Sequence, residues 1–151
     1  MNFMKEALKE AKKAYDKGEV PIGAVVVKNG EIIGRGHNRR ETDKNALYHA
    51  EVIAINDACK NLGGWRLPDT EIYVTLEPCP MCMGAIISAR IDKLYYGAKD
   101  EKSGCAGSVA DLSKALPHKV SVTSGVLEEE CSKIIKSFFK ELRISKTQEV
   151  K

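Results

Sequence analysis

The sequence lacks a long apolar segment, since no run of apolar residues approaches the roughly 20 that a membrane-spanning helix requires. Its opening residues, Met1 to Leu8, do not show the charged-then-apolar order of a secretory signal peptide. Internal repeats and low-complexity tracts are also missing, and only five residues are proline. From these absences we expect a cytoplasmic protein that does not associate with a membrane.

Length and composition are those of an ordinary globular protein. The chain has 151 residues, of which 43% are hydrophobic and 30% charged, and this length is close to the commonest size of one domain. We therefore expect a single domain over residues 1–151, in which only Lys146 to Lys151 form a frayed polar tail. The net charge of +3 suits contact with a few phosphates, but it suits many other surfaces equally well.

The five cysteines point to metal binding or free thiols. A reducing cytosol disfavours disulfides, and an odd number of cysteines cannot all pair within one chain. The cysteines are Cys59, Cys79, Cys82, Cys105 and Cys131.

Hydrophobic periodicity predicts alternating helices and strands. Helical spacing covers residues 4–15, 49–62, 79–89 and 127–142, and strand-like runs cover residues 22–27, 31–34, 72–76, 93–98 and 119–124. The Asn29-Gly30 pair between the first two strands is a strong hairpin signal. This order of elements predicts an α/β protein, a three-layer α/β/α sandwich around a five-stranded mixed sheet.

Three candidate metal ligands stand at the starts of two predicted helices. His49 opens one helix, and Cys79 and Cys82 occupy the first turn of the next. Side chains at positions i and i+3 share a helix face, so both sulfurs can reach one ion. The helix N-terminus favours the thiolate form that zinc binds. Three protein ligands leave one tetrahedral position open, which is typical of a catalytic zinc.

Glu51 lies two residues after the candidate histidine ligand. A glutamate beside a water molecule at the metal can take its proton and pass it on to a substrate. The pattern His-x-Glu followed by Pro-Cys-x-x-Cys is the signature of zinc-dependent nucleobase deaminases, in which the glutamate is not a metal ligand. Glu51 is thus the candidate catalytic residue.

Two other interpretations of the Cys-x-x-Cys motif explain less of the sequence. A redox pair leaves His49 and Glu51 without a role and lacks the usual Trp-Gly context. A structural zinc needs a fourth ligand, and Cys59 lies in the middle of a helix on its expected core face.

Beyond this motif, the chain resembles the bacterial tRNA adenosine deaminases over nearly its whole length. The segments that carry the resemblance are 18–26, 36–39, 49–51, 66–67, 73–82, 96–100, 104–108, 125–131 and 138–139. The resemblance implies a cytidine deaminase-like fold, one Zn²⁺ per chain and a homodimer. It also implies hydrolytic deamination of adenosine to inosine at the wobble position of tRNA, with the anticodon loop as the partner.

The resemblance further assigns substrate contacts. Asn38 is expected to hydrogen-bond the flipped adenine, and Asp100 with Lys102 to lie against neighbouring nucleotides. Ala50, between the metal ligand and the glutamate, is carried over as another substrate-binding position. Asn38 could equally cap a turn, and the Asp100 loop could be an ordinary solvated loop. Tyr96, Phe138 and Phe139 are expected to belong to the core rather than to stack on bases, although Phe139 at its edge could still reach a nucleotide.

Basic residues offer possible phosphate contacts, although charge runs are usually solvated faces. The candidates are Arg35, Arg39, Arg40 and Lys44, together with the lysines of the last predicted helix.

Two departures from the family pattern keep a second enzymatic function open. Leu47 and Tyr48 replace smaller residues before the metal-ligand histidine, and the loop that ends in Leu116-Pro117-His118 is shortened. Either change could favour a free nucleobase or nucleoside, of guanine, adenine or cytosine type, over RNA. A non-catalytic subunit is a third possibility, but such subunits usually lose the glutamate, which here is Glu51.

Overall fold

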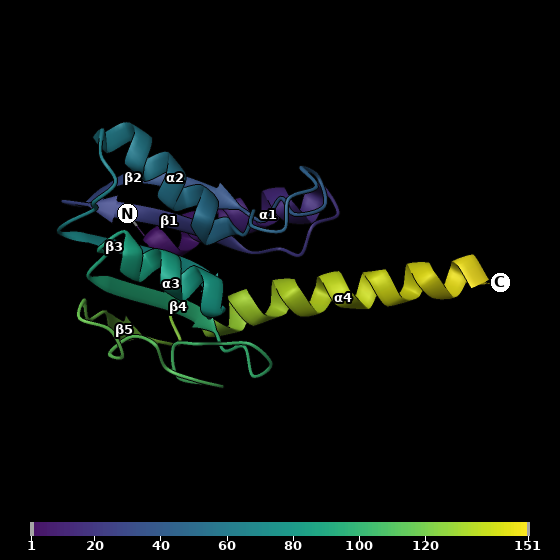
Figure 1. Cartoon of the computed structure of the whole chain (residues 1–151). Coiled ribbons are helices and arrows are strands. Elements are labelled where there is room, and N and C mark those ends of the chain that lie inside the picture. The colour runs from purple at the N-terminus through teal and green to yellow at the C-terminus, as the bar shows by residue number, and fades with distance from the viewer. Residues whose placement is uncertain (1, 151) are drawn as a thin grey trace.

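The computed structural model describes the chain over residues 2–150, with side chains through residue 147. Within these residues, five strands form one sheet with helices on both of its faces (Figure 1). The elements are α1 (Phe3–Asp16), β1 (Gly23–Lys28), β2 (Glu31–His37), α2 (Ala50–Leu62), β3 (Thr70–Leu76), α3 (Pro80–Ser88), β4 (Lys93–Ala98), β5 (Ser121–Thr123) and α4 (Glu128–Val150).

The sheet has the mixed topology that the sequence predicts. Its strand order is β2-β1-β3-β4-β5, in which β1 runs antiparallel to both neighbours and β3, β4 and β5 run parallel. Asn29 and Gly30 join β1 to β2 with φ angles of 51° and 77°. Positive φ at both central residues is the requirement of a type I′ hairpin turn, so the hairpin prediction is confirmed.

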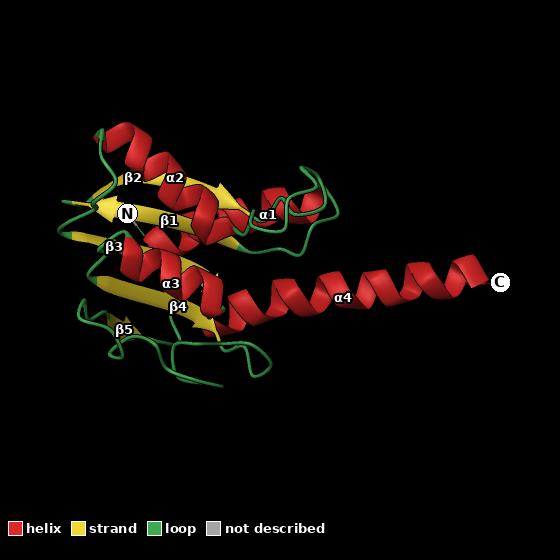
Figure 2. Cartoon of the chain, in the orientation of Figure 1, coloured by secondary structure: helices red, strands yellow, loops and turns green. Residues whose placement is uncertain are grey.

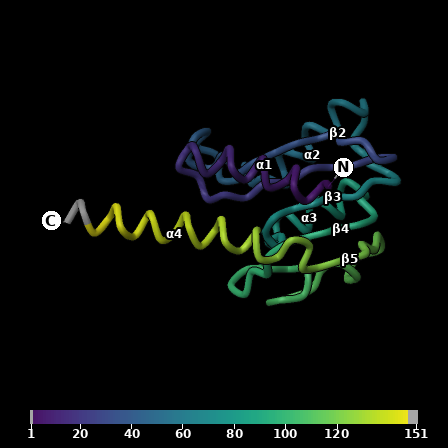
Figure 3. The backbone as a smooth tube through the Cα atoms, turned by 180° about the vertical axis from the view of Figure 1, so that it is seen from behind, coloured from purple at the N-terminus to yellow at the C-terminus, as the bar shows by residue number. Residues whose placement is uncertain are grey.

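Two hydrophobic clusters make the three layers. Val26, Val74 and Met83 belong to the cluster between the sheet and the pair α2 and α3. Val25 and Val27, which point to the other face of β1, belong to the cluster beneath α1 and the start of α4. Figure 2 shows α2 and α3 in front of the yellow strands, and Figure 3 shows α1 and α4 on the opposite side. The predicted α/β/α sandwich is confirmed.

Glycines on β2 let α2 lie unusually close to the sheet. A Cβ atom at Gly34 would fall 2.3 Å from the backbone oxygen of Ala54, and one at Gly36 would fall 2.4 Å from that of Ala50. Any side chain at these positions would push the helix outward. Because α2 begins at Ala50, this contact sets the position of the first helical turn, where the candidate catalytic residues lie.

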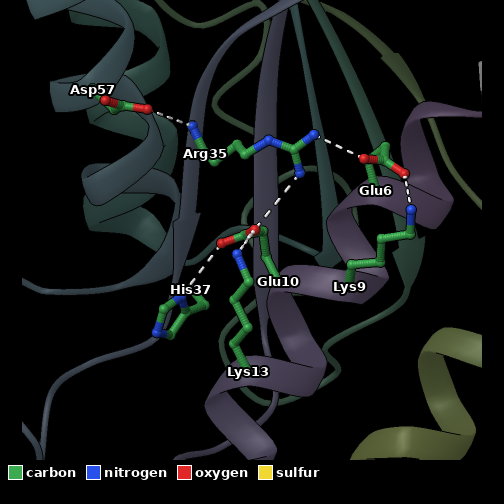
Figure 4. Close-up of polar contacts among 7 residues, drawn as sticks. All are labelled: Glu6, Lys9, Glu10, Lys13, Arg35, His37 and Asp57. Atoms are coloured by element: carbon green, nitrogen blue, oxygen red, sulfur yellow. Dashed lines mark hydrogen bonds and ion pairs between the residues drawn. The ribbon is translucent and has the colours of Figure 1, made fainter.

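A polar network fastens α1 to the edge strand β2 (Figure 4). The Arg35 guanidinium pairs with Glu6 at 2.8 Å and with Glu10 at 3.6 Å, and His37 Nδ1 lies 3.4 Å from Glu10. Burial opposes the ionisation of Glu10, but hydrogen bonds from His37 and Lys13 outweigh it and lower its pKa to about 2. Glu10 is therefore a buried carboxylate that its neighbours keep charged.

Helix α4 corrects one prediction. Lys146 to Lys151 were expected to form a frayed tail, yet the helix continues through Val150, and Lys151 lies outside the described residues. No glycine or proline follows Gly125, so nothing in this segment interrupts the backbone hydrogen bonds of the helix. Figures 1 and 3 show its second half projecting beyond the sheet.

Across residues 2–150, no helix combines the length and apolar character needed to cross a membrane.

Candidate active site

The first turns of α2 and α3 present the candidate metal ligands side by side. His49 is the N-cap of α2 and Cys79 the N-cap of α3, and neither side chain is used for capping. Pro80 follows at the first helical position, where the absence of an N–H does no harm. Cys82 stands one turn into α3, three residues after Cys79. Both helices thus direct free ligand atoms to one point.

The spacing of these atoms fits zinc. Among the described residues, the ligand atoms of His49, Cys79 and Cys82 all lie within 4.8 Å of one another. The Nδ1 atom of His49 lies 3.7 Å from the sulfur of Cys79 and 3.5 Å from that of Cys82. Tetrahedral zinc, with bonds of about 2.3 Å to sulfur and about 2.0 Å to nitrogen, needs an N···S separation of about 3.5 Å. These separations are compatible with one tetrahedral zinc ion held by the three residues.

The two cysteines differ in their readiness to ionise. A hydrogen bond from Cys82, with a further contribution from His49, lowers the pKa of Cys79 to about 4 despite burial. The same hydrogen bond, together with burial, raises the pKa of Cys82. Cys79 is therefore a thiolate at neutral pH, the form that binds metals, and a metal ion would displace the proton of Cys82.

Glu51 lies beside this cluster in the first turn of α2. It is only 4% exposed. Burial raises its pKa to about 7, and the negative charge of Cys79 acts in the same direction. A carboxyl group whose pKa lies near neutrality can both accept and return a proton, as a general acid–base catalyst must.

A cavity of about 360 Å³ opens next to the candidate metal ligand His49. This volume is at the lower end of the range typical of small-ligand sites. Its walls are Gly18, Glu19, Val20, Ile22, Asn38, Arg40, Glu41, His49, Phe138, Phe139 and Leu142.

Asn38 lines the cavity, and its side chain also hydrogen-bonds the backbone of neighbouring turns. Its side-chain amide donates to the backbone oxygen of Val20 and accepts from the backbone N–H of Arg40, each at 3.3 Å. These bonds use one of its two N–H donors and one of its acceptor positions. One donor and one acceptor remain, so the turn and substrate interpretations are compatible.

Asp100 and Lys102 line a neighbouring cavity rather than the one beside His49. That second cavity shares Val20 and Phe139 with the first. The Asp100 carboxylate accepts hydrogen bonds from the backbone N–H groups of Lys102 and Ser103 and so organises its own loop. The assignment of both residues as substrate contacts stays a prediction.

Ala50 lies inside the protein. Its side chain is fully buried against the sheet, so any contact with substrate would have to come from its backbone. Its assignment as a substrate-binding residue stays a prediction.

The basic stretch divides into paired and cavity-facing residues. Arg35 belongs to the network with Glu6 and Glu10, and Arg39 pairs with Asp43 at 2.7 Å. Arg40 lines the cavity beside His49, whereas Lys44 is exposed and is not part of its lining. This leaves Arg40 as the member of the stretch best placed to meet a substrate phosphate.

Two contributions to the cavity were not singled out in the sequence. Glu19 is 1% exposed and accepts the backbone N–H groups of Glu41 and Thr42, and it thereby holds the loop that leads to His49. Leu142 comes from far along the chain and joins Phe139 in the wall. The one sequence feature that pointed to this wall was the Phe138-Phe139 pair. Adjacent residues of a helix point in different directions, so one of the two rings was expected to face away from the core.

Comparison with known proteins assigns the family. A sequence model of the MafB19-like deaminase family matches residues 1–143. This chain belongs to that family of deaminases. Among its relatives, a tRNA-specific adenosine deaminase of Bacillus subtilis (strain 168) is 56% identical over 95% of this chain and 91% of its own length. A tRNA-specific adenosine deaminase of Rickettsia bellii (strain RML369-C) is 47% identical over 93% of this chain and 99% of its own.

Solved structures agree with the fold of this deaminase. One comes from a study of A-to-I editing by tRNA:A34 deaminases at the wobble position of transfer RNA. It has a TM-score of 0.82 and 45% identity, covering 87% of this chain and 97% of its own. A guanine deaminase from Bacillus subtilis has a lower TM-score of 0.63 and 34% identity, covering 93% and 91%. By both measures this deaminase is more similar to the first structure than to that guanine deaminase.

Proposed function

We propose that this deaminase converts adenosine to inosine at the wobble position of tRNA, with one zinc ion held by His49, Cys79 and Cys82. The observation that carries the proposal is the three-ligand cluster beside a buried glutamate and an open cavity. The high identity to tRNA-specific adenosine deaminases over nearly the whole chain supports RNA as the substrate.

Glu51 is the proton carrier of the proposed reaction. When bound, zinc supplies a water molecule with a pKa of about 7. Glu51 takes a proton from this water and delivers it to N1 of adenine, and it then carries the second proton to the amino group on C6. The water oxygen forms the new bond to C6, and the C6–N bond then breaks, so that the amino group leaves as ammonia. Adenosine and water thus give inosine and ammonia, and Glu51 ends in the state in which it began.

The cavity binds and orients the base. Asn38 offers its remaining donor and acceptor to one edge of the base, and the two backbone hydrogen bonds of its amide fix the direction. Phe138, Phe139 and Leu142 supply apolar surface in the same cavity, against which the base can pack. A base enters such a pocket only after leaving its stack, which requires less free energy in an anticodon loop than in a duplex.

The experiment that tests the proposal compares RNA with free bases. The purified zinc-loaded deaminase is given an anticodon stem-loop with adenosine at the wobble position and, separately, adenine, guanine, cytosine and their nucleosides. We expect inosine and ammonia from the stem-loop. Removal of zinc with a chelator should abolish turnover, and zinc should restore it. Turnover of a free base without turnover of the stem-loop would overturn the proposal.

Salt dependence gives an independent check on RNA binding. If phosphates contact Arg40 and the lysines of α4, the affinity for the stem-loop must fall steeply with salt, because binding releases condensed counterions. A flat response would argue for a small uncharged substrate.

Two further features belong to this proposal. The family resemblance favours a homodimer, which sedimentation at several protein concentrations tests. A function on tRNA favours the cytoplasm as its location, which localisation of a tagged chain tests.

A further inference from the structure

Glu77 is a buried carboxylate in the short segment that joins β3 to α3. It follows β3 directly, and its backbone N–H donates to Ala98 at the end of β4. Two residues later comes the metal ligand Cys79. Although glutamate is rarely buried unless it is paired, the residue is only 2% exposed.

Backbone dipoles, rather than a cation, compensate its charge. The carboxylate accepts the backbone N–H of Asp100 at 3.1 Å and those of Ala106 and Ser108 at 3.0 Å each. It also accepts the Ser108 hydroxyl. Over residues 2–147, no lysine, arginine or histidine forms an ion pair with it. All four donors belong to one segment, residues 99–112, here termed the rim loop.

The rim loop wraps tightly around this carboxylate. A Cβ atom at Gly104 would fall 2.4 Å from the carboxyl carbon of Glu77, so only glycine fits there. The next residue, Cys105, donates its backbone N–H to the backbone oxygen of Pro78 at 2.8 Å. Pro78 lies between Glu77 and the metal ligand Cys79. The rim loop is therefore hydrogen-bonded both to Glu77 and to the residue that follows it.

A chain of contacts leads from Glu77 to the second cavity. Glu77 holds the backbone of Asp100, and the Asp100 side chain in turn holds the backbone N–H of Lys102 at 3.0 Å. Asp100 and Lys102 both line that cavity, which adjoins the cavity beside His49. The position of these side chains relative to the metal ligands therefore depends on the Glu77 carboxylate.

We propose that Glu77 is a positioning residue that sets the distance between the metal site and the rim loop, and thereby the affinity for the nucleotides beside the reacting base. The part that concerns nucleotides rests on the proposed function. The part that concerns the loop does not, and it can be tested without any substrate.

The variant Glu77→Gln keeps the shape of the side chain but turns one acceptor oxygen into a donor that faces other donors. The matched control is Glu71→Gln, the same change within the preceding strand β3, at a residue that makes no hydrogen bond to the rim loop among residues 2–147. Hydrogen exchange should accelerate by about tenfold at the amides of Asp100, Ala106 and Ser108 in Glu77→Gln and stay unchanged in the control. Zinc content should remain one per chain.

Steady-state kinetics on the stem-loop then separate positioning from chemistry. We expect KM to rise by about tenfold in Glu77→Gln while kcat changes by less than about threefold. Ser108→Ala removes only the hydroxyl donor and should shift the same amides and KM in the same direction by a smaller factor. It also keeps the proposal testable if Glu77→Gln does not fold.

Several results would overturn the proposal. These are unchanged exchange in both Glu77→Gln and Ser108→Ala, equal acceleration in Glu71→Gln, or a fall in kcat at constant KM. If the wild-type protein does not deaminate the stem-loop, the proposed function fails, and the exchange experiment still decides the role of Glu77.

Discussion

Glu10 and Glu51 lie on opposite faces of the same sheet and are almost equally buried, at 3% and 4% exposed. Their carboxyl groups nevertheless have pKa values of about 2 and about 7. Burial opposes ionisation in both. Around Glu10, however, Lys13 and Arg35 supply positive charge and His37 a hydrogen bond (Figure 4), whereas the negative charge of Cys79 acts on Glu51.

The comparison shows that burial raises the pKa of a carboxyl group, as at Glu51, unless its neighbours outweigh burial, as they do at Glu10. Glu10 is held permanently charged and joins α1 to β2. The pKa of Glu51 lies near neutrality, so this residue can both accept and release a proton, as a general acid–base catalyst must. The same substitution, glutamate to glutamine, should therefore have opposite consequences at the two sites.

The largest effect is expected for activity in Glu51→Gln. Without the carboxylate no group carries the proton, so kcat on the stem-loop should fall by about 10³-fold. Zinc content should stay at one per chain, because the candidate ligands are His49, Cys79 and Cys82 and do not include Glu51. The free energy of unfolding should not decrease, since the change removes a buried negative charge beside Cys79. Activity within threefold of wild type would contradict the catalytic role.

The converse result is expected for Glu10→Gln. A folded-state pKa of about 2, against an ordinary value of 4.5, corresponds to about 3 kcal/mol of stability at neutral pH. Urea denaturation at pH 7 should show a loss of this order, while kcat at a temperature where the variant is folded stays near that of wild type. A loss of activity without a loss of stability would reverse the two roles.

The stability difference between wild type and Glu10→Gln should depend on pH. The folded-state pKa of Glu10, about 2, lies below its ordinary value of 4.5. Its contribution is therefore fully present above about pH 4.5 and is lost as the pH falls toward 2. Denaturation curves of both proteins between pH 7 and pH 3 should converge as the pH falls. A difference that grows with acid would disprove the sign of the shift.

The smallest effect is expected for Glu6→Gln. Glu6 shares Arg35 with Glu10, but its side chain is 13% exposed against 4% for Glu10, and solvent weakens exposed ion pairs. Its substitution should reduce the free energy of unfolding by clearly less than Glu10→Gln does. Equal losses in the two variants would mean that the network acts through Arg35 rather than through burial of Glu10.

Much of the fold was predictable because its signals are local. Apolar periodicity and the Asn29-Gly30 turn identified the helices and strands, and alternating elements implied a covered mixed sheet. Boundaries were less certain. The fifth strand was expected over residues 119–124 but spans Ser121–Thr123, and α4 was expected to end near Leu142 but continues through Val150. Polar residues without glycine or proline look alike in a helix and in a tail.

The candidate metal site could also be predicted from local sequence signals. A histidine and two cysteines at helix starts, with Glu51 beside them, are recognisable from residue type and spacing alone. The walls of the cavity were not, because Glu19, Phe139 and Leu142 come from segments more than a hundred residues apart. The pairing of Arg35 with Glu6 and Glu10 likewise requires two elements to be packed together before it can be seen.

The sequence by itself determined the reaction type, since ligand chemistry and a proton carrier reside in a few residues at fixed spacing. It also determined the layered α/β architecture, because periodicity reflects which face of each element is buried. Only the tertiary structure decided which glutamate is structural and which is poised for proton transfer. It also decided that the rim loop is built around Glu77. Ionisation and loop position depend on the groups within a few ångströms, and those groups are brought together by the packing of distant segments.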